Sequence, residues 1–299
     1  MYAYKYILFS VYLQKIQYYN NMLTLNFSAP ETGATEEIKD KKDEVIYNNS
    51  TVIRSVDNNQ FRILRNIMKL YGIDKIDVDP TYSIGNFYKK QNVKGEIIQI
   101  PDPTYKFDVY PQAKDVVKIE PLTSWPLKDS SCHCINVDLP FVISPHNAPS
   151  AKDPKDGSCI TQQRFASFYP VQELFETYYF FLKECYRILD DDGILIWKSQ
   201  NSISAQKQIN TPEMSWFFAE SIGFDMVDKF VLTAEARLLS SKHSKQQHSR
   251  RFESYFLVFK KSQKKKTKYL TFDNETIMRN IVEGFFNNNF KNIPKYQPK

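Results

Sequence analysis

The residues of this sequence that are best suited to chemistry follow a short apolar run at positions 134–137. Apolar, β-branched residues bounded by a proline predict a buried strand that stops before Pro140, because proline cannot donate into a sheet ladder. Asp138 then stands at the carboxyl tip of the strand, where ligands of open α/β sheets gather. Its carboxylate can accept a hydrogen bond from an exocyclic amine, the Leu139 carbonyl can accept a second, and the Phe141 ring can stack on the base. Methylation of an amino nitrogen on adenine or cytosine needs these groups.

Three more acids follow predicted strands earlier in the chain. The strands at 75–79, 105–110 and 116–120 end at or near the acids Asp79, Asp108 and Glu120. A turn after the first strand contains Gly85, and glycine allows a positive φ and a close approach of the backbone. Because the carboxyl ends of parallel strands meet at one edge of a sheet, we expect these acids to lie near Asp138.

The tetrapeptide Asp138-Leu139-Pro140-Phe141 resembles the Asp-Pro-Pro-Tyr/Phe/Trp signature of S-adenosylmethionine-dependent methyltransferases that modify amino groups in nucleic acid. The resemblance implies that these four residues are catalytic and that the target base is flipped into the site. Leu139 replaces the first proline of the signature. This departure keeps the backbone carbonyl but predicts a looser placement of it.

The same resemblance assigns the earlier acids to the cofactor, S-adenosylmethionine. Asp79 and the turn with Gly85 correspond to the loop that cradles the amino-acid part of the cofactor. Asp108 corresponds to the acid on the ribose hydroxyls, and Glu120 to the position that contacts the adenine. The family usually has two or three glycines in the loop, whereas this chain has Gly85 alone.

A basic segment at 241–251 resembles the Lys-Gln-Gln-His and basic run before the last strand of bacterial and phage-type DNA methyltransferases of this group. The predicted nucleic-acid-binding residues are Lys242, Lys245, Gln247, His248, Arg250 and Arg251. From Lys242 to Lys268 there are ten Lys or Arg and one acid, Glu253. Such a patch can neutralise phosphates, which makes binding salt-dependent. An ordinary solvated surface is the alternative.

The remaining periodic segments supply the elements that must position these residues. Apolar spacing predicts helices at 57–71, 171–189 and 211–222, the last with Thr211 as N-cap. A turn at 190–193 leads into a strand at 194–198, and two more strands are expected at 224–236 and 254–259. The long stretch 144–169 is either a loop that closes over the base or a mobile insertion. With the resemblance, this order predicts an α/β fold, a Rossmann-like class I methyltransferase with a seven-stranded, mostly parallel sheet and a terminal antiparallel strand.

Composition limits the class of protein. The 299 residues, 42% hydrophobic, predict one core at 55–261, between a flexible extension at 1–54 and a basic, Asn-rich tail at 262–299. The apolar run at 6–13 is too short to span a bilayer, so no membrane partner is expected. The four cysteines lack zinc-site spacing, which predicts no metal and favours a reducing, intracellular compartment, cytoplasmic or nuclear. A net charge of +6 favours a polyanionic partner.

The sequence therefore predicts methyl transfer from S-adenosylmethionine to the exocyclic amino group of a base, with adenine N6 in DNA ahead of cytosine and of RNA. One alternative is an RNA-directed methyltransferase. The other is a catalytically degenerate subunit that binds nucleic acid or a partner methyltransferase, which Leu139 and the single glycine favour.

Overall fold

The computed structural model describes residues 52–144, 166–204, 206–235, 248–249, 251–261 and 283. From Ile53 onward these residues belong to one compact unit. Most of the predicted amino-terminal extension, the stretch 145–165 and most of the predicted tail lie outside the described residues.

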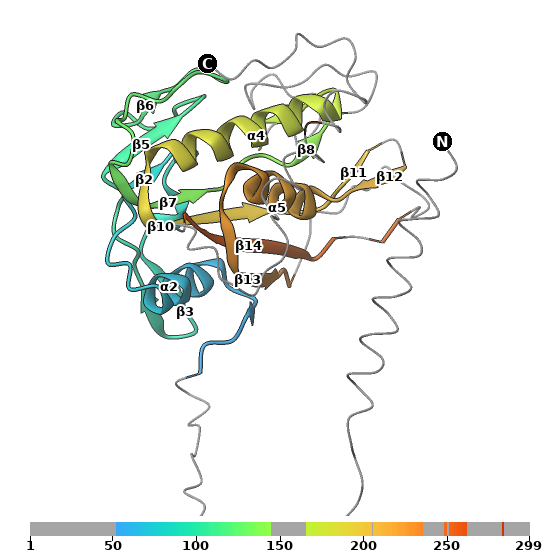
Figure 1. The fold of residues 1–299 in the computed structure, drawn as a ribbon. Coiled ribbons are helices and arrows are strands. Elements are labelled where there is room, and N and C mark those ends of the chain that lie inside the picture. Colours follow the sequence, from blue (N-terminus) through green and yellow to red (C-terminus); the bar gives the residue numbers. More distant parts are fainter. Residues whose placement is uncertain are drawn as a thin grey trace, which may run out of the picture. The chain divides into compact units, whose positions relative to one another are not determined.

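An eight-stranded sheet forms the centre of this unit (Figure 1), in the order β1-β13-β14-β10-β7-β2-β5-β6. The strands are β1 (Val56–Asp57), β2 (Val78–Asp79), β5 (Tyr105–Asp108), β6 (Val117–Lys118), β7 (Cys132–Val137), β10 (Leu189–Ser199), β13 (Asp225–Thr233) and β14 (Glu253–Lys260). Neighbours are parallel except where β14 pairs with β10 and β13. The mostly parallel sheet with an antiparallel last strand is confirmed. The predicted number of seven strands is wrong, because β1 is too short to show a pattern in the sequence.

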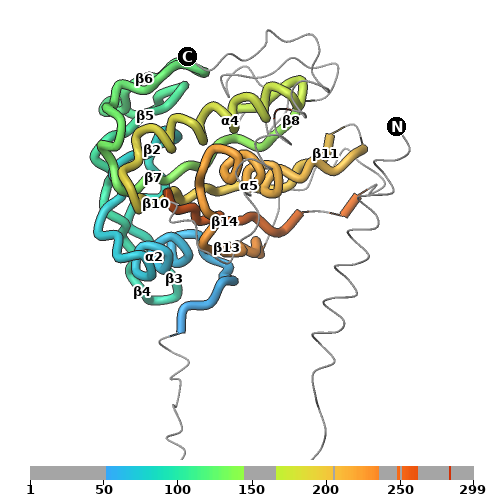
Figure 2. The backbone as a smooth tube through the Cα atoms, viewed as in Figure 1, coloured from blue at the N-terminus to red at the C-terminus, as the bar shows by residue number. Residues whose placement is uncertain are grey.

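Three helices of the described residues cover the two faces of the sheet (Figures 1 and 2). Helices α4 (Val171–Ile188) and α5 (Thr211–Ile222) lie on one face, and α2 (Gln60–Leu70) lies on the other. Strand β10 serves both cores, since Leu195 and Trp197 pack with α4 and α5 while Ile194 and Ile196 pack with α2. Alternation of this kind follows from the period of two along a strand. All three predicted helices are confirmed.

The helix ends match the sequence with one correction. Asn59 caps α2, since its side-chain oxygen accepts hydrogen bonds from the backbone N–H groups of Phe61 and Arg62, both at 3.0 Å. At α5 the N-cap is Asn210, without a side-chain bond, and Thr211 is the first helical residue. Thr211 is completely buried, so packing rather than capping determines its place.

The predicted turn at 190–193 is instead an irregular part of β10. The register with β7 shifts between Leu189 and Ile194, and Asp192 has a φ of +66°. The Asp192 N–H donates to the Lys261 carbonyl at 2.7 Å, and the Lys261 N–H donates to the Gly193 carbonyl at 2.9 Å. An Asp- and Gly-rich sequence suits a β-bulge as well as a turn, and pairing with the neighbouring strands of the sheet decides between them.

Among the described residues, three small ladders and a short helix lie outside the main sheet, and none of them was predicted from the sequence. The ladders join β3 (Gln91–Val93) to β4 (Glu96–Ile98), β8 (Val142–Ile143) to β9 (Ser167–Phe168), and β11 (Ser202–Ser204) to β12 (Lys207–Ile209). The β3–β4 hairpin lies beside α2 (Figure 2), where Glu96 pairs with Arg65. The 3-10 helix η1 spans Asn86–Tyr88.

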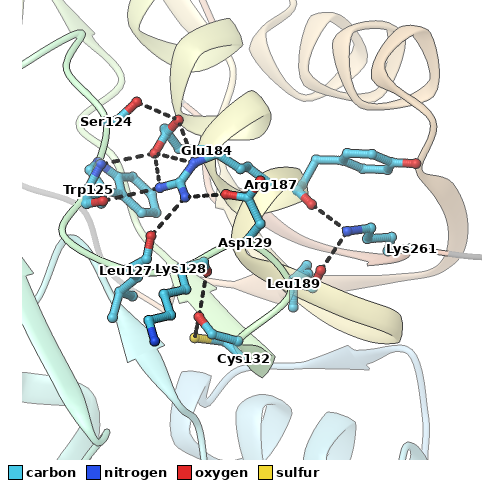
Figure 3. Close-up of polar contacts among 12 residues, drawn as sticks. Ser124, Trp125, Leu127, Lys128, Asp129, Cys132, Glu184, Arg187, Leu189 and Lys261 are labelled. Carbon is cyan, nitrogen blue, oxygen red and sulfur yellow. Dashed lines mark hydrogen bonds and ion pairs between the residues drawn. The ribbon is translucent and has the colours of Figure 1, made fainter.

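A group of polar contacts around Arg187 holds in place the segment of chain that leads into β7 (Figure 3). The Arg187 guanidinium donates to Glu184 at 2.7 Å and to Asp129 at 2.8 Å. It also donates to the carbonyls of Leu127 and Trp125 at 2.8 and 3.1 Å, and the Trp125 N–H donates to Glu184 at 2.9 Å. The segment before β7 is thereby held to the end of α4, which fixes where β7 begins.

Candidate functional site

The candidate site lies at the carboxyl ends of β2 and β7, where the order of the sheet reverses. From β2 the chain proceeds to β5 and β6 on one side, and then to β7 and β10 on the other. Asp79 is the last residue of β2, and Asp138 directly follows β7. In open α/β sheets a crevice at such a switch point is the usual place for a ligand.

The first half of the predicted catalytic tetrapeptide is held by β2 and the core. The Asp138 N–H donates to the Thr81 hydroxyl oxygen at 2.9 Å. Leu139 is 4% exposed and packs in the core beneath α4. Burial of this side chain fixes the backbone at the position where the resemblance expects a proline.

The second half is held through its carbonyls. The Tyr178 hydroxyl, on α4, donates to the Pro140 carbonyl at 3.0 Å. Burial, followed by the charge of Asp138, raises the pKa of this hydroxyl, so it remains a donor. Ser202 of β11 donates through its hydroxyl to the Phe141 carbonyl. All four tetrapeptide residues therefore have a fixed backbone, and Phe141 itself is half-buried.

Lys198 is a polar residue of this site that the sequence did not predict. Its ammonium donates to Oδ2 of Asp138 at 2.8 Å. The sequence predicted the strand that contains Lys198, but it did not predict that Lys198 lies beside Asp138. Because Trp197 pairs with Val137 in parallel register, the next residue along each strand brings Lys198 alongside Asp138.

Asp79 is 2% exposed and forms a buried network with Thr81, Tyr88 and Asn136. Oδ1 accepts from the Thr81 N–H at 2.8 Å and from its hydroxyl at 2.9 Å. Oδ2 accepts from the Tyr88 hydroxyl at 2.5 Å and from the Asn136 amide at 3.4 Å. Burial raises the pKa of Asp79 to about 6, although these hydrogen bonds act in the opposite direction. The roughly four acceptor positions of the carboxylate are all used.

The turn after β2 requires glycine at position 85. Gly85 has a φ of +68°, and a Cβ there would lie 2.4 Å from the Tyr82 hydroxyl oxygen. Tyr82 stacks on Tyr88 with ring centroids 5.4 Å apart and donates to Asp102 at 3.0 Å. The group that closely approaches Gly85 is therefore the ring of Tyr82, which belongs to the same turn.

The two remaining predicted cofactor acids differ in their surroundings. Asp108, at the end of β5, accepts from the backbone N–H groups of Ser83 at 2.8 Å and Tyr110 at 2.7 Å. Burial raises the pKa of Asp108, and these bonds oppose the shift. Glu120 lies beyond β6, is exposed and pairs with Lys118 at 2.6 Å.

The structure thus brings most of the predicted site residues to one edge of the sheet. Thr81 links Asp79 to Asp138, because its hydroxyl donates to the first and accepts from the backbone of the second. Ser83 links the turn with Gly85 to Asp108. The turn 80–88 therefore lies between the ends of three strands.

The predicted nucleic-acid-binding segment lies largely outside the described residues, which include neither Lys242, Lys245, Gln247 nor Arg250. His248 is exposed. Arg251 donates to the Ser249 hydroxyl at 2.5 Å and to the side chain of Gln208 on β12. The hairpin β11–β12 therefore contacts Arg251 through Gln208 and the predicted catalytic segment through Ser202, and these two hairpin residues belong to adjacent pairs of the ladder.

Within the described ranges, no cluster of three or more His, Cys, Asp or Glu side chains could hold a metal ion. His133, between two buried cysteines, pairs with Asp190 at 3.0 Å. Among the described residues, no helix is long and apolar enough to cross a membrane.

No protein-family model matches this chain, and no curated protein is similar to it in sequence.

Proposed function

We propose that this chain transfers a methyl group from S-adenosylmethionine to the exocyclic amino group of a base in nucleic acid, with N6 of adenine in DNA as the target. The observation that carries the proposal is the position of Asp138 at the switch point, followed by a half-buried aromatic ring whose backbone is held in place. The antiparallel strand β14, placed between β10 and β13, also suits the methyltransferase fold that the sequence resembles.

The acids at the strand ends fit this cofactor at two of three positions. Asp108 accepts two backbone hydrogen bonds from the turn and the next loop, which leaves acceptor positions for ribose hydroxyls. Glu120 is exposed at the neighbouring strand end. Asp79 has no acceptor position left, so its role is to hold the turn with Gly85. When bound, S-adenosylmethionine supplies a methyl group on a positively charged sulfur.

The chain's own residues orient the amine. Asp138 and the Leu139 carbonyl accept the two amino hydrogens, which turns the nitrogen lone pair toward the methyl donor. The Phe141 ring stacks on the base and contributes about 1 to 3 kcal/mol to binding, as in readers of single strands. Because a 1 Å error in such an arrangement costs about a hundredfold in rate, the fixed backbone of the tetrapeptide favours activity.

A catalytically degenerate subunit is the second candidate, and the turn 80–88 favours it. Gly85 packs against Tyr82, and Asp79 is saturated by contacts within the protein. Such a subunit would bind nucleic acid or a partner methyltransferase and carry out no transfer alone.

The test is transfer of a labelled methyl group to short adenine-containing DNA and RNA oligonucleotides. Asp138→Ala and Phe141→Ala should each abolish transfer while cofactor affinity, measured by calorimetry, stays within a few-fold. Asp190→Ala is the control, because Asp190 is an exposed residue near the opposite end of β7. Unchanged turnover in either site variant would move the active site elsewhere. Lack of cofactor binding at millimolar concentration, with transfer only after a partner is added, would establish the second candidate.

A further inference from the structure

Lys198 is held by groups from three elements and by Asp138, which follows β7. Its ammonium donates to Asp138 at 2.8 Å and to Oε1 of Gln60, on α2, at 3.3 Å. It lies 5.2 Å from the ring centroid of Phe87 in η1 and 5.9 Å from that of Phe256 in β14. The side chain is 14% exposed. Two oxygen acceptors and two ring faces thus fix one positive charge beside Asp138.

The Lys198 contact leaves one oxygen of Asp138 for a ligand. Lys198 occupies Oδ2, whereas no group among the described residues donates to Oδ1. The Asp138 side chain is 27% exposed, so a ligand can reach it. The pair is neutral as a whole, which changes what kind of amine the acid can bind.

A charged and a neutral amine respond to this pair in different ways. A protonated aliphatic amine is drawn to an isolated carboxylate, but here that charge is already matched and the Lys198 ammonium repels a second cation. A neutral aromatic amine needs only the hydrogen-bond acceptor that Oδ1 provides. Phe141, three residues further along the chain, is half-buried, and the Ser202 hydroxyl holds its carbonyl in place.

We infer that Lys198 is a specificity-determining residue that makes the Asp138 site select neutral aromatic amines and reject protonated alkylamines. The inference rests on the proposed function and deepens it, because only an unprotonated nitrogen has the lone pair that can attack a methyl group. Amino bases of nucleic acid satisfy this condition at neutral pH, whereas lysine side chains and polyamines do not.

Binding of two probes, 9-ethyladenine and n-butylammonium, tests the inference without any catalysis. Calorimetric or NMR titrations are compared with those of Asp138→Asn, so that only binding dependent on this acid is counted. The wild type should bind 9-ethyladenine more tightly than n-butylammonium. Lys198→Met should shift the ratio of the two dissociation constants toward the ammonium by at least about tenfold, the equivalent of one hydrogen bond to a charged group. Lys198→Arg, which keeps the charge, should retain the wild-type preference.

Lys229→Met is the matched control, because Lys229 is an exposed lysine of the same sheet whose ammonium lies over Tyr255. It should behave as the wild type. Lys198→Gln repeats the test if the methionine variant does not fold. An unchanged ratio in the neutral variants, or no Asp138-dependent binding by the wild type, overturns the inference. Intact selectivity in a chain that transfers no methyl group would support the inference and refute the proposed function.

Discussion

The buried Asp79 carboxyl predicts an unusual dependence of stability on pH. Burial raises its pKa from the ordinary 3.8 to about 6 in the folded chain. Between these values the folded state binds more protons than the unfolded state, so the free energy of unfolding falls as the pH rises. The stabilisation is fully present below about pH 4 and is lost as the pH rises through about 6. A rise of the pKa from 3.8 to about 6 corresponds to about 3 kcal/mol over the full pH range.

Asp79→Asn removes this titration while keeping a side chain of similar size. The free energy of unfolding of Asp79→Asn minus that of the wild type should therefore increase by about 2 kcal/mol between pH 4 and pH 7. The constant part of the difference reflects the altered hydrogen bonds with Tyr88 and Asn136 and is not used. Subtraction also cancels the titration of every other group that the two proteins share.

Urea unfolding followed by far-UV circular dichroism at a series of pH values measures this difference. Asp74→Asn, at an exposed aspartate on the approach to β2, is the matched control against which the pH dependence of Asp79→Asn is compared. A flat difference for Asp79→Asn would refute the reasoning, because it would mean that the buried carboxyl has the same proton affinity in the folded and unfolded chain.

Two further predictions concern the elements around the site. Arg187→Met leaves the buried Glu184 carboxylate without its cation and should lower the free energy of unfolding by about 2 to 4 kcal/mol in urea titrations. Arg187→Lys keeps the positive charge and should lower the free energy of unfolding by less. Equal losses in the two variants would show that the charge contributes nothing. Gly85→Ala should lower the melting temperature more than Gly72→Ala, because both alanines have a positive φ, worth about 1 to 2 kcal/mol, but only the first meets Tyr82. Equal shifts in the two variants would contradict the close contact.

The elements with a clear periodicity were predictable from the sequence. Helices α2, α4 and α5 repeat apolar residues at helical spacing, and β7 and β10 contain continuous apolar runs, so local pattern was sufficient to find them. The two-residue strand β1 and the bulge at 190–193 carry no such pattern. Their structure depends on which chain segment lies alongside, which neighbouring residues in the sequence do not specify.

For the candidate site, the sequence identified the acids at strand ends and the tetrapeptide at 138–141, since each stands at the boundary of a readable strand. It could not show their partners. The bond from Asp79 to Asn136 and the pair of Asp138 with Lys198 join residues far apart in the chain. Such contacts follow from strand order and register, and a shift of one residue in the pairing of β7 with β10 would turn Lys198 to the other face of the sheet.

The sequence by itself determined that acids would stand at the carboxyl ends of parallel strands, because strand boundaries and residue types are local properties. Only the tertiary structure decided that Asp79 is saturated and buried, that Leu139 is fixed by the core, and that Asp138 carries a neutralising lysine. The physical reason is that burial and charge pairing depend on long-range packing, which raises a pKa or matches a charge only once distant segments are brought together.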